Sequence, residues 1–339
     1  MIIAGIDEAG YGPLLGPLVV SASAFQTPGT VLPTEVAELP NIWKLLKPVV
    51  FQKNAGKAAA KGGLLIADSK VVHHLNGGDR LLERGVLAMY QNLAMPDGSR
   101  GLAEGLCAGK FLEVLGCCGH GLEEHPWYAG RAIGMPWRCE KGDLAIVTNM
   151  LRGALARAQV EVRALRTVVV PERKFNQLVG GSHNKASTLI SITMTHLYYL
   201  HQQFGSEGLV VGVDKQGGRD HYTGLLLQSF PEAKIKVLRE DEGGSSYLLQ
   251  EGATGSGRQT IIHFREKCET HFLPTALASM ICKYLRELYM DCFNAWWCGQ
   301  IENLMPTAGY YQDGMRWLGE VEPHLERLRV RREDLVRCR

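Results

Sequence analysis

The start of this chain constrains its fold more than any other stretch. The apolar run 1–6 predicts a buried β-strand that ends in two adjacent carboxylates, Asp7 and Glu8. A Gly-Tyr-Gly turn at residues 10–12 follows, and residues 18–26 predict a second strand. Acidic side chains are uncommon in strands, and a buried charge needs a partner. A divalent cation could be that partner, and the glycines would let backbone amides approach a ligand.

The same pattern occurs a second time, far along the chain. The apolar run 209–213 predicts a buried strand that ends in Asp214 and a glycine-containing turn. An Asx turn at the strand end is the alternative interpretation of Asp214. Glu269 then precedes a predicted helix whose small residues allow it to pack close to the sheet, namely Ala276, Ala278 and Ser279. Lys283 and Arg286 lie three residues apart on this helix, a spacing suited to a phosphate or to orienting a carboxylate.

Composition limits the function classes. The chain has 339 residues, of which 45% are hydrophobic, and this is enough for one large domain or two smaller ones. The formal net charge is only +2, so any basic surface must be local. No apolar run reaches membrane-span length and the N-terminus has no basic segment, so we expect a soluble, cytoplasmic protein. Nine cysteines, an odd count, argue against a disulfide framework.

Four motifs together resemble those of one family. Residues 5–13, Gly-Ile-Asp-Glu-Ala-Gly-Tyr-Gly-Pro, are similar to the opening signature of the type 2 ribonucleases H. Residues 68–70, Asp-Ser-Lys, resemble its second motif, and the strand ending in Asp214 resembles its third. Residues 267–287 are similar to its fourth motif, an acidic residue followed by a helix rich in small side chains. The motifs occur in the family's order.

The resemblance implies an α/β, ribonuclease H-like fold. We expect a mixed five-stranded sheet flanked by helices, with strands 1–3 antiparallel and a C-terminal helical extension. Residues 1–265 would form the catalytic core, and residues 266–339 the catalytic helix and the C-terminal helical region. Two segments would be insertions in the core, a helical lobe at about 96–142 and a hairpin or loop at about 240–264.

The resemblance also implies an activity. Asp7, Glu8, Asp214 and Glu269 would be the catalytic residues and the ligands of a two-metal Mg²⁺ or Mn²⁺ site, with Asp7 bridging the metals. The reaction would be hydrolysis of RNA in RNA/DNA hybrids, or at ribonucleotides embedded in duplex DNA, leaving a 3′-hydroxyl and a 5′-phosphate. The partner is therefore nucleic acid, with no membrane, and the enzyme would act as a monomer.

Further residues match positions that contact substrate in the family. These are Gly10, Tyr11, Gly12, Asp68, Ser69, Lys70, Asn184, Lys283 and Tyr310. Several of them have a structural alternative, because Asp68, Ser69 and Asn184 are also typical helix N-caps. Tyr310 could equally be a core aromatic residue, and Tyr311 is an alternative to it.

The chain departs from the family pattern at several places. Tyr11 stands where the family has an arginine, so a guanidinium contact from this loop is lost, although backbone recognition by the glycines can persist. Glu269 replaces an aspartate and moves its charge outward by one methylene. The acidic run 240–242 is a rival ligand set, although such a run on a glycine-rich loop is usually a solvated turn.

The segment 96–142 accumulates potential metal ligands, but it contains no Cys-x-x-Cys pair. A zinc site there is therefore the weaker interpretation, and buried thiols and aromatic rings the simpler one. The residues in question are Cys107, Cys117, Cys118, His120, His125, Trp127, Trp137 and Cys139. The arginines near the C-terminus are interleaved with acids, which favours a solvated amphipathic helix. Two other functions stay open: a nuclease of the same fold acting on another structured substrate, and a non-catalytic nucleic-acid-binding module.

Overall fold

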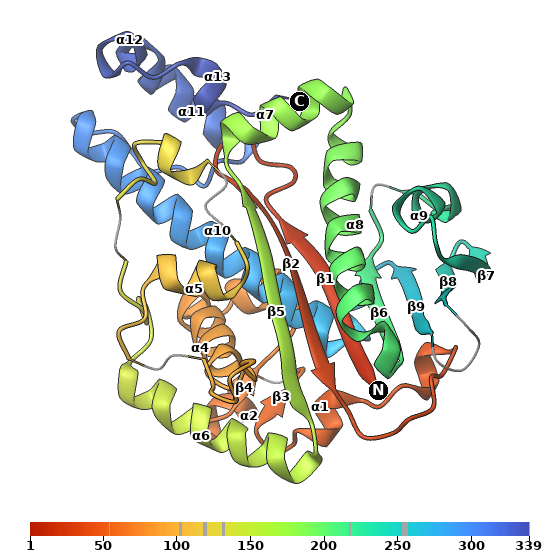
Figure 1. The fold of residues 1–339 in the computed structure, drawn as a ribbon. Helices are drawn as coiled ribbons and strands as arrows, with labels where there is room; N and C mark the ends of the chain where they lie inside the picture. The colour runs from red at the N-terminus through yellow and green to blue at the C-terminus, as the bar shows by residue number, and fades with distance from the viewer. Residues whose placement is uncertain are drawn as a thin grey trace.

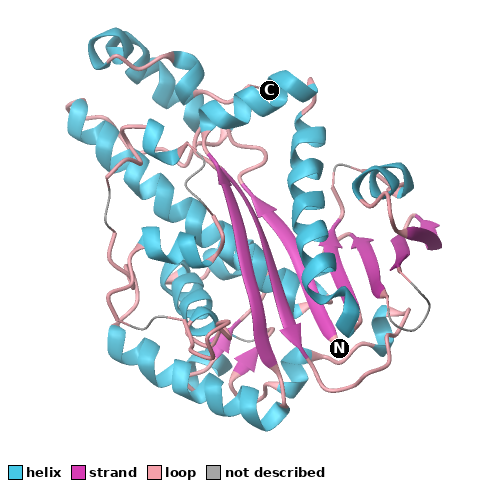
Figure 2. Cartoon of the chain, viewed as in Figure 1, coloured by secondary structure: helices cyan, strands magenta, loops and turns pink. Residues whose placement is uncertain are grey.

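A computed structural model describes residues 1–53, 55–101, 104–117, 121–130, 133–216, 218–252 and 257–338. Its centre is a mixed sheet of seven strands in the order β5-β2-β1-β6-β9-β8-β7 (Figures 1 and 2). The strands are β1 (Ile2–Ala9), β2 (Leu18–Gln26), β5 (Glu161–Val170), β6 (Leu209–Asp214), β7 (Lys234–Asp241), β8 (Gly244–Glu251) and β9 (Arg258–Arg265). Two short strands, β3 (Val50–Phe51) and β4 (Leu64–Leu65), pair in parallel as a separate sheet.

The α/β architecture and the antiparallel start of the sheet are confirmed. β2 pairs antiparallel with both β1 and β5, whereas β6 runs parallel to β1 and to β9. The expectation of five strands is wrong, because the segment near 240–264 supplies β8 and β9 to the main sheet. In β8, the side chains of Tyr247 and Leu249 are buried, an alternation that the glycines at its ends obscured.

Helices cover both faces of the sheet (Figure 1). The long helix α10 (Leu273–Gln300) packs on β1 and β2 from one side, and α8 (Lys185–Phe204) contacts β1, β2, β6 and β9 from the other. The strand alternation produces two apolar cores, since Ile3 belongs to the α10 core while Ile2 and Ala4 belong to the α8 core.

The remaining helices are mostly short. They are α1 (Ile42–Leu45), α2 (Ala55–Ala60), α3 (Ser69–His73), α4 (Gly78–Tyr90), α5 (Ala108–Val114), α6 (Lys141–Ala158), α7 (Glu172–Ser182), α9 (Thr223–Ser229), α11 (Tyr311–Val321), α12 (Leu325–Leu328) and α13 (Arg332–Leu335). The 3₁₀ turns are η1 (Val36–Glu38), η2 (Leu122–Glu124), η3 (Gly205–Glu207), η4 (Cys268–Thr270) and η5 (Glu322–His324). No helix in the described ranges has the length and apolarity needed to cross a membrane.

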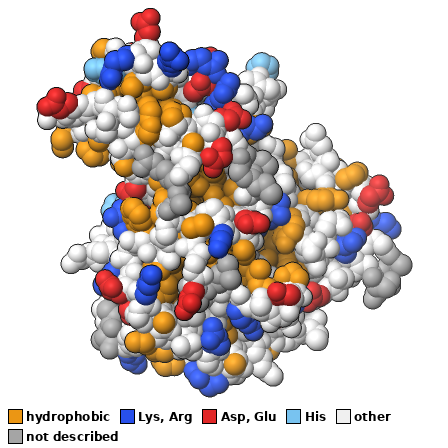
Figure 3. All heavy atoms as spheres, turned by 60° about the vertical axis from the view of Figure 1, so that its left-hand side comes forward, with side chains coloured by type: hydrophobic (Ala, Val, Ile, Leu, Met, Phe, Trp, Pro, Cys, Tyr) orange, Lys and Arg blue, Asp and Glu red, His pale blue; other side chains and the backbone are white. Residues whose placement is uncertain are grey.

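The described part of the segment 96–142 contains α5, η2 and the first residues of α6. It packs on α10 through Trp127, whose ring lies 5.7 Å from that of Trp297 between centroids. Cys117 and Cys139 are buried in the apolar core, whereas Cys118 and His120 lie outside the described residues. On the face shown in Figure 3, basic side chains gather at both ends of the molecule, over the C-terminal helices and over the region of α1, α2 and α6.

Candidate active site

Strand pairing brings the first two carboxylates of the site together. β1 and β6 are parallel neighbours, and Ile6 lies opposite Val213 in the register. Asp7 and Asp214 are the next residues on the two strands, so they emerge side by side at the same edge of the sheet. The two strands that end in a carboxylate, which are far apart in the sequence, therefore place their acids at one edge of the sheet.

Two glycines allow the third element of the site to approach this edge. A Cβ atom on Gly5 would overlap the backbone of Thr275, and one on Gly212 would lie 2.6 Å from the Phe272 ring. Neither glycine has a positive φ, so close packing rather than turn geometry is the reason for them. Their effect is to let η4 and the start of α10 pack directly on β1 and β6, which places Glu269 beside the strand ends.

The four predicted carboxylates line a single cavity of about 340 Å³. Its other charged and polar side chains include those of Asp68, Ser69, Lys70, Ser279, Lys283 and Tyr310. The Gly-Tyr-Gly turn of residues 10–12 forms part of its wall. Residues from five separated parts of the sequence thus converge on one cavity.

Hydrogen bonds fix some of the carboxylate oxygens and leave another without a partner. Oδ1 of Asp7 accepts from the backbone N–H of Glu8 at 2.7 Å, and Oδ1 of Asp214 accepts from the N–H of Cys268 at 3.1 Å. Oε2 of Glu8 is buried and has no hydrogen-bond partner. An orphaned, buried carboxylate oxygen is costly unless a cation or a donor meets it.

The site is short of positive charge. Burial and the neighbouring Glu8 charge raise the pKa of Asp7 well above its ordinary value. Burial and the Asp214 charge raise the pKa of Glu8 to about 7, although the charge of Lys70 opposes this shift. Burial also raises the pKa values of Asp214 and Glu269. Four acids with raised pKa values therefore share one cavity, an arrangement typical of functional sites.

These residues fit a divalent metal by their chemistry. All four are hard oxygen donors, which Mg²⁺ and Mn²⁺ prefer, and one oxygen is orphaned. Within the described residues, no three His, Cys, Asp or Glu side chains already lie close enough together to hold an ion.

The two glycines of the turn have different structural demands. Gly10 has φ of +86°, and a Cβ there would overlap the carbonyl oxygen of Pro17, so only glycine fits without strain. Gly12 has no positive φ, and a Cβ on it would meet nothing within 4 Å. The backbone at Gly12 therefore faces open space at the cavity wall, where a ligand can approach it. Between them, the ring of Tyr11 lies 5.4 Å from Nζ of Lys185.

A buried arginine from the C-terminus holds this turn, and the sequence analysis missed it. Arg337 is only 1% exposed, and its guanidinium donates to the carbonyl oxygens of Gly10, of Tyr11 at 2.9 Å and of Gly16 at 3.3 Å. It also stacks over the Phe175 ring, with Cζ 4.0 Å from the centroid. The expectation that the C-terminal arginines are solvated is wrong for this residue, and no local pattern distinguishes it from its neighbours.

A second buried arginine, Arg286, binds the end of the same loop at Pro17. Its guanidinium donates to the carbonyl oxygens of Pro17 at 3.1 Å and Ala308 at 3.1 Å, so its main contacts are backbone carbonyls. Glu172 completes this buried polar layer, accepting from the N–H of Gly16 at 3.1 Å and from the Tyr128 hydroxyl at 3.0 Å. Burial raises the pKa of Glu172 to about 7.

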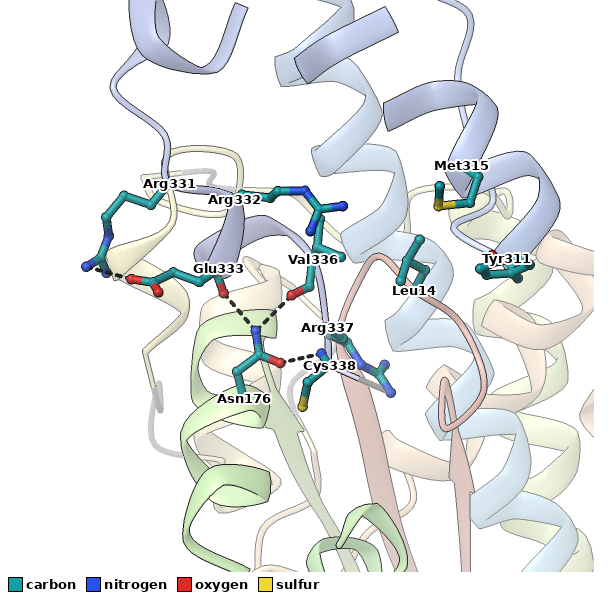
Figure 4. Close-up of a pocket in the computed structure, with 10 residues that line it drawn as sticks. All are labelled: Leu14, Asn176, Tyr311, Met315, Arg331, Arg332, Glu333, Val336, Arg337 and Cys338. Carbon is teal, nitrogen blue, oxygen red and sulfur yellow. Dashed lines mark hydrogen bonds and ion pairs between the residues drawn. The ribbon is translucent and has the colours of Figure 1, made fainter. Parts of the chain in front are cut away.

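The C-terminal segment that carries Arg337 is anchored on α7. Figure 4 shows Asn176 pointing at this segment, where its amide donates to the carbonyl oxygens of Glu333 and Val336, both at 2.8 Å. Its Oδ1 accepts from the N–H of Cys338 at 2.7 Å. A second cavity of about 850 Å³ lies here, and Tyr311 lines it. Tyr310 instead lines the carboxylate cavity and is 54% exposed, which separates the two adjacent tyrosines by position.

The other predicted contact residues are partly structural. Asp68 caps α3, accepting from the N–H of Lys70 at 2.8 Å, and it also lines the carboxylate cavity, so both interpretations fit its position. Lys283 lines the cavity while forming an ion pair with Glu287. Asn184 caps α8 through Ala186 and lies outside the residues that line the cavity. Its substrate contact stays a prediction.

Comparison with known proteins adds a weak likeness. No protein-family model and no curated protein matches the sequence. The chain is similar to solved structures of ribonucleases HII and HIII. They include ribonuclease HII from Archaeoglobus fulgidus in a complex with PCNA, at 14% identity and a TM-score of 0.41, covering 100% of this chain and 95% of that one.

Two further structures show the same level of likeness. Ribonuclease H2 from Pyrococcus horikoshii has 12% identity and a TM-score of 0.42, covering 99% of this chain and 92% of that one. Bst-RNase HIII in complex with Mn²⁺ has 13% identity and a TM-score of 0.44, covering 99% of this chain and 66% of that one.

Proposed function

We propose that the protein is a divalent-metal-dependent endonuclease that hydrolyses RNA strands in RNA/DNA hybrids or at ribonucleotides embedded in duplex DNA. The observation that carries the proposal is the convergence of Asp7, Glu8, Asp214 and Glu269 on one cavity. The order and spacing of the motifs, which resemble those of type 2 ribonucleases H, support the same function.

Asp7, Glu8, Asp214 and Glu269 would hold the metal, with the orphaned Oε2 of Glu8 among the donors. Bound divalent cations supply a water nucleophile at neutral pH and charge neutralisation at phosphorus. Lys70 stands at the same cavity and already offsets part of the negative charge of the acids, so it is placed to attract a phosphate oxygen. No side chain needs to form a covalent intermediate.

The turn at residues 10–12 would read the ribose. Two buried arginines fix the carbonyl groups of the loop, so its backbone is positioned before substrate binds. The open space at Gly12 leaves room for a sugar to meet the backbone, and a 2′-hydroxyl can donate and accept hydrogen bonds there. The exposed ring of Tyr310 is placed to stack at the edge of the cavity.

A cleavage assay tests the function. Three duplexes are offered with Mg²⁺ or Mn²⁺: one with a single embedded ribonucleotide, one RNA/DNA hybrid and one of DNA alone. We expect the wild type to cut only the ribonucleotide-containing strands, leaving 3′-hydroxyl and 5′-phosphate ends, and Asp7→Asn to lose this activity. Asp241→Asn, from the rival acidic run, is the matched control and should keep it. Cutting of DNA alone would favour another structured substrate, and binding without cutting would leave a non-catalytic module.

A further inference from the structure

A second charged cavity lies outside the carboxylate site, between α1 and α2. It has a volume of about 380 Å³, and we call it the lysine cavity. Five lysines line it: Lys44, Lys47, Lys53, Lys57 and Lys61. All five are exposed, and no acidic residue is among the described residues that line the cavity.

The sequence around this cavity contains positive charges but no negative ones. Residues 39–67 contain these five lysines and no Asp, Glu, Arg or His, a local charge of +5. Because the formal net charge of the chain is +2, the rest of the chain carries 2 − 5 = −3. Over the described parts of the chain, none of the five lysines has a salt-bridge partner. This segment is therefore one local basic surface on a chain with little net charge.

Such a cluster is poorly explained by solvation alone. A sphere of the cavity's volume is about 9 Å across. The Debye length at physiological salt is about 8 Å, so the fields of the lysines overlap within the cavity. Like charges around one cavity repel one another, and a polyanion would remove that repulsion. Elsewhere in the described structure, arginines are commonly paired with nearby acids, as Arg316 is with Asp313 and Glu320.

The lysine cavity adjoins the carboxylate site. The side-chain amide of Gln52, which lines the lysine cavity, donates to the carbonyl oxygen of Thr270 at 2.7 Å, and Thr270 follows Glu269. β3 pairs with β4, and β4 leads within three residues to Asp68. Trp43 braces this connection, because its Nε1 donates to the carbonyl of Ile66 at 2.8 Å.

We propose that the lysine cavity binds the phosphodiester backbone of a nucleic-acid duplex on one side of the cleavage position. This inference rests on the proposed function for its substrate. Amines on flexible stems suit this role, since backbone contacts need charge but no base recognition. The cavity would contribute affinity and orientation, while the carboxylate cavity carries the chemistry.

Binding measurements test the proposal in the Asp7→Asn background, so that the duplex is not cut. The test variant replaces Lys44, Lys47 and Lys57 by Gln. The control variant replaces three exposed lysines from other regions: Lys110, Lys234 and Lys236. Thermal unfolding verifies that both variants stay folded. Fluorescence anisotropy then gives the Kd for a duplex extending about 10 base pairs to each side of the ribonucleotide and for one extending about 5.

We expect the test variant to bind the long duplex more weakly, with a salt slope smaller by about 2.7, as for three lost phosphate contacts. The ratio of its Kd to the Kd of the control variant then falls about 40-fold between about 50 and about 200 mM salt. The short duplex should show little difference. Equal Kd values and slopes for the two variants on the long duplex would overturn the proposal.

Two further binding measurements distinguish a duplex ligand from a small polyphosphate, and a failure of this proposal from a failure of the proposed function. Lysine-dependent binding of inorganic tripolyphosphate, with unchanged affinity for the long duplex, would assign the cavity to a small polyphosphate and overturn the proposal. An all-DNA duplex of the same length is measured in parallel. Lysine-dependent binding of that duplex supports the backbone contact even if the cleavage assay fails, so the two failures are distinguishable.

Discussion

Removal of the Arg337 side chain tests whether the C-terminus positions the turn at the active site. In Arg337→Ala, the carbonyl oxygens of Gly10 and Tyr11 lose a buried, charged donor, and the Phe175 ring loses its cation. Although burial lowers the pKa of Arg337 to about 9, the group remains charged at neutral pH. The native state therefore contains a buried charge whose partners are backbone carbonyls and Glu172.

The magnitude follows from these contacts. A hydrogen bond to a charged group contributes about 1.5–3 kcal/mol, and a buried cation–π contact about 2 kcal/mol. Desolvation of the guanidinium offsets part of this sum, so we expect Arg337→Ala to lower the free energy of unfolding by about 3–5 kcal/mol. Arg337→Lys keeps the charge but cannot span both carbonyls, so about half of that loss should remain.

Urea denaturation followed by intrinsic tryptophan fluorescence gives the free energy of unfolding. Arg332→Ala is the matched control, because Arg332 is exposed and pairs with Glu322 at the surface, where an ion pair contributes about 0–1 kcal/mol. If Arg337→Ala unfolds within about 1 kcal/mol of the control, the guanidinium does not hold the turn and the reasoning is refuted.

Three other predictions concern the same region. Gly12→Ala should leave the free energy of unfolding within about 0.5 kcal/mol of wild type but weaken ribonucleotide-duplex binding about tenfold. Gly10→Ala should lower the free energy of unfolding by about 2 kcal/mol. If the two variants gave the same free energy of unfolding and the same Kd, this prediction would be contradicted. Tyr310→Ala should weaken binding by about 1–3 kcal/mol through lost stacking, while Tyr311→Ala should not, and anisotropy titrations distinguish them. The pKa of Glu172 is raised to about 7, so this carboxyl stays protonated in the native state at pH values where it is already ionised in the unfolded chain. The free energy of unfolding should therefore fall as the pH rises from about 4.5 to 7, and this group should lower it no further above pH 7. The stability difference between wild type and Glu172→Gln should change by about 3 kcal/mol over that window, and parallel pH profiles would show that this carboxyl does not titrate as argued.

The carboxylates could be predicted from the sequence because each belongs to a local pattern. Asp7 and Asp214 each follow an apolar run, and the parallel pairing of two such strands makes their ends neighbours. Glu269 precedes a helix of small residues, which indicated close packing before the partners were known. Gly5 and Gly212 provide the matching space on the sheet.

Other features depend on contacts that leave no local pattern. Arg337 lies among several C-terminal arginines, and only the seating of its segment on Asn176 and the turn makes it a buried residue. The expected five-stranded sheet was wrong because glycines and serines flank the apolar residues of β8, and pairing with β9 decides its structure. The five lysines were not singled out in the sequence analysis, because their common cavity depends on the fold of α1, β3 and α2.

Titration with Mn²⁺, followed by the electron paramagnetic resonance signal of the free ion, tests the central claim most directly. The claim is that the carboxylates at the ends of β1 and β6, with Glu269, form one metal site. We predict that the wild type and the Asp241→Asn control bind Mn²⁺ with the same affinity, while Asp7→Asn and Asp214→Asn each lose that binding. Unchanged Mn²⁺ affinity in both of these variants would contradict the account.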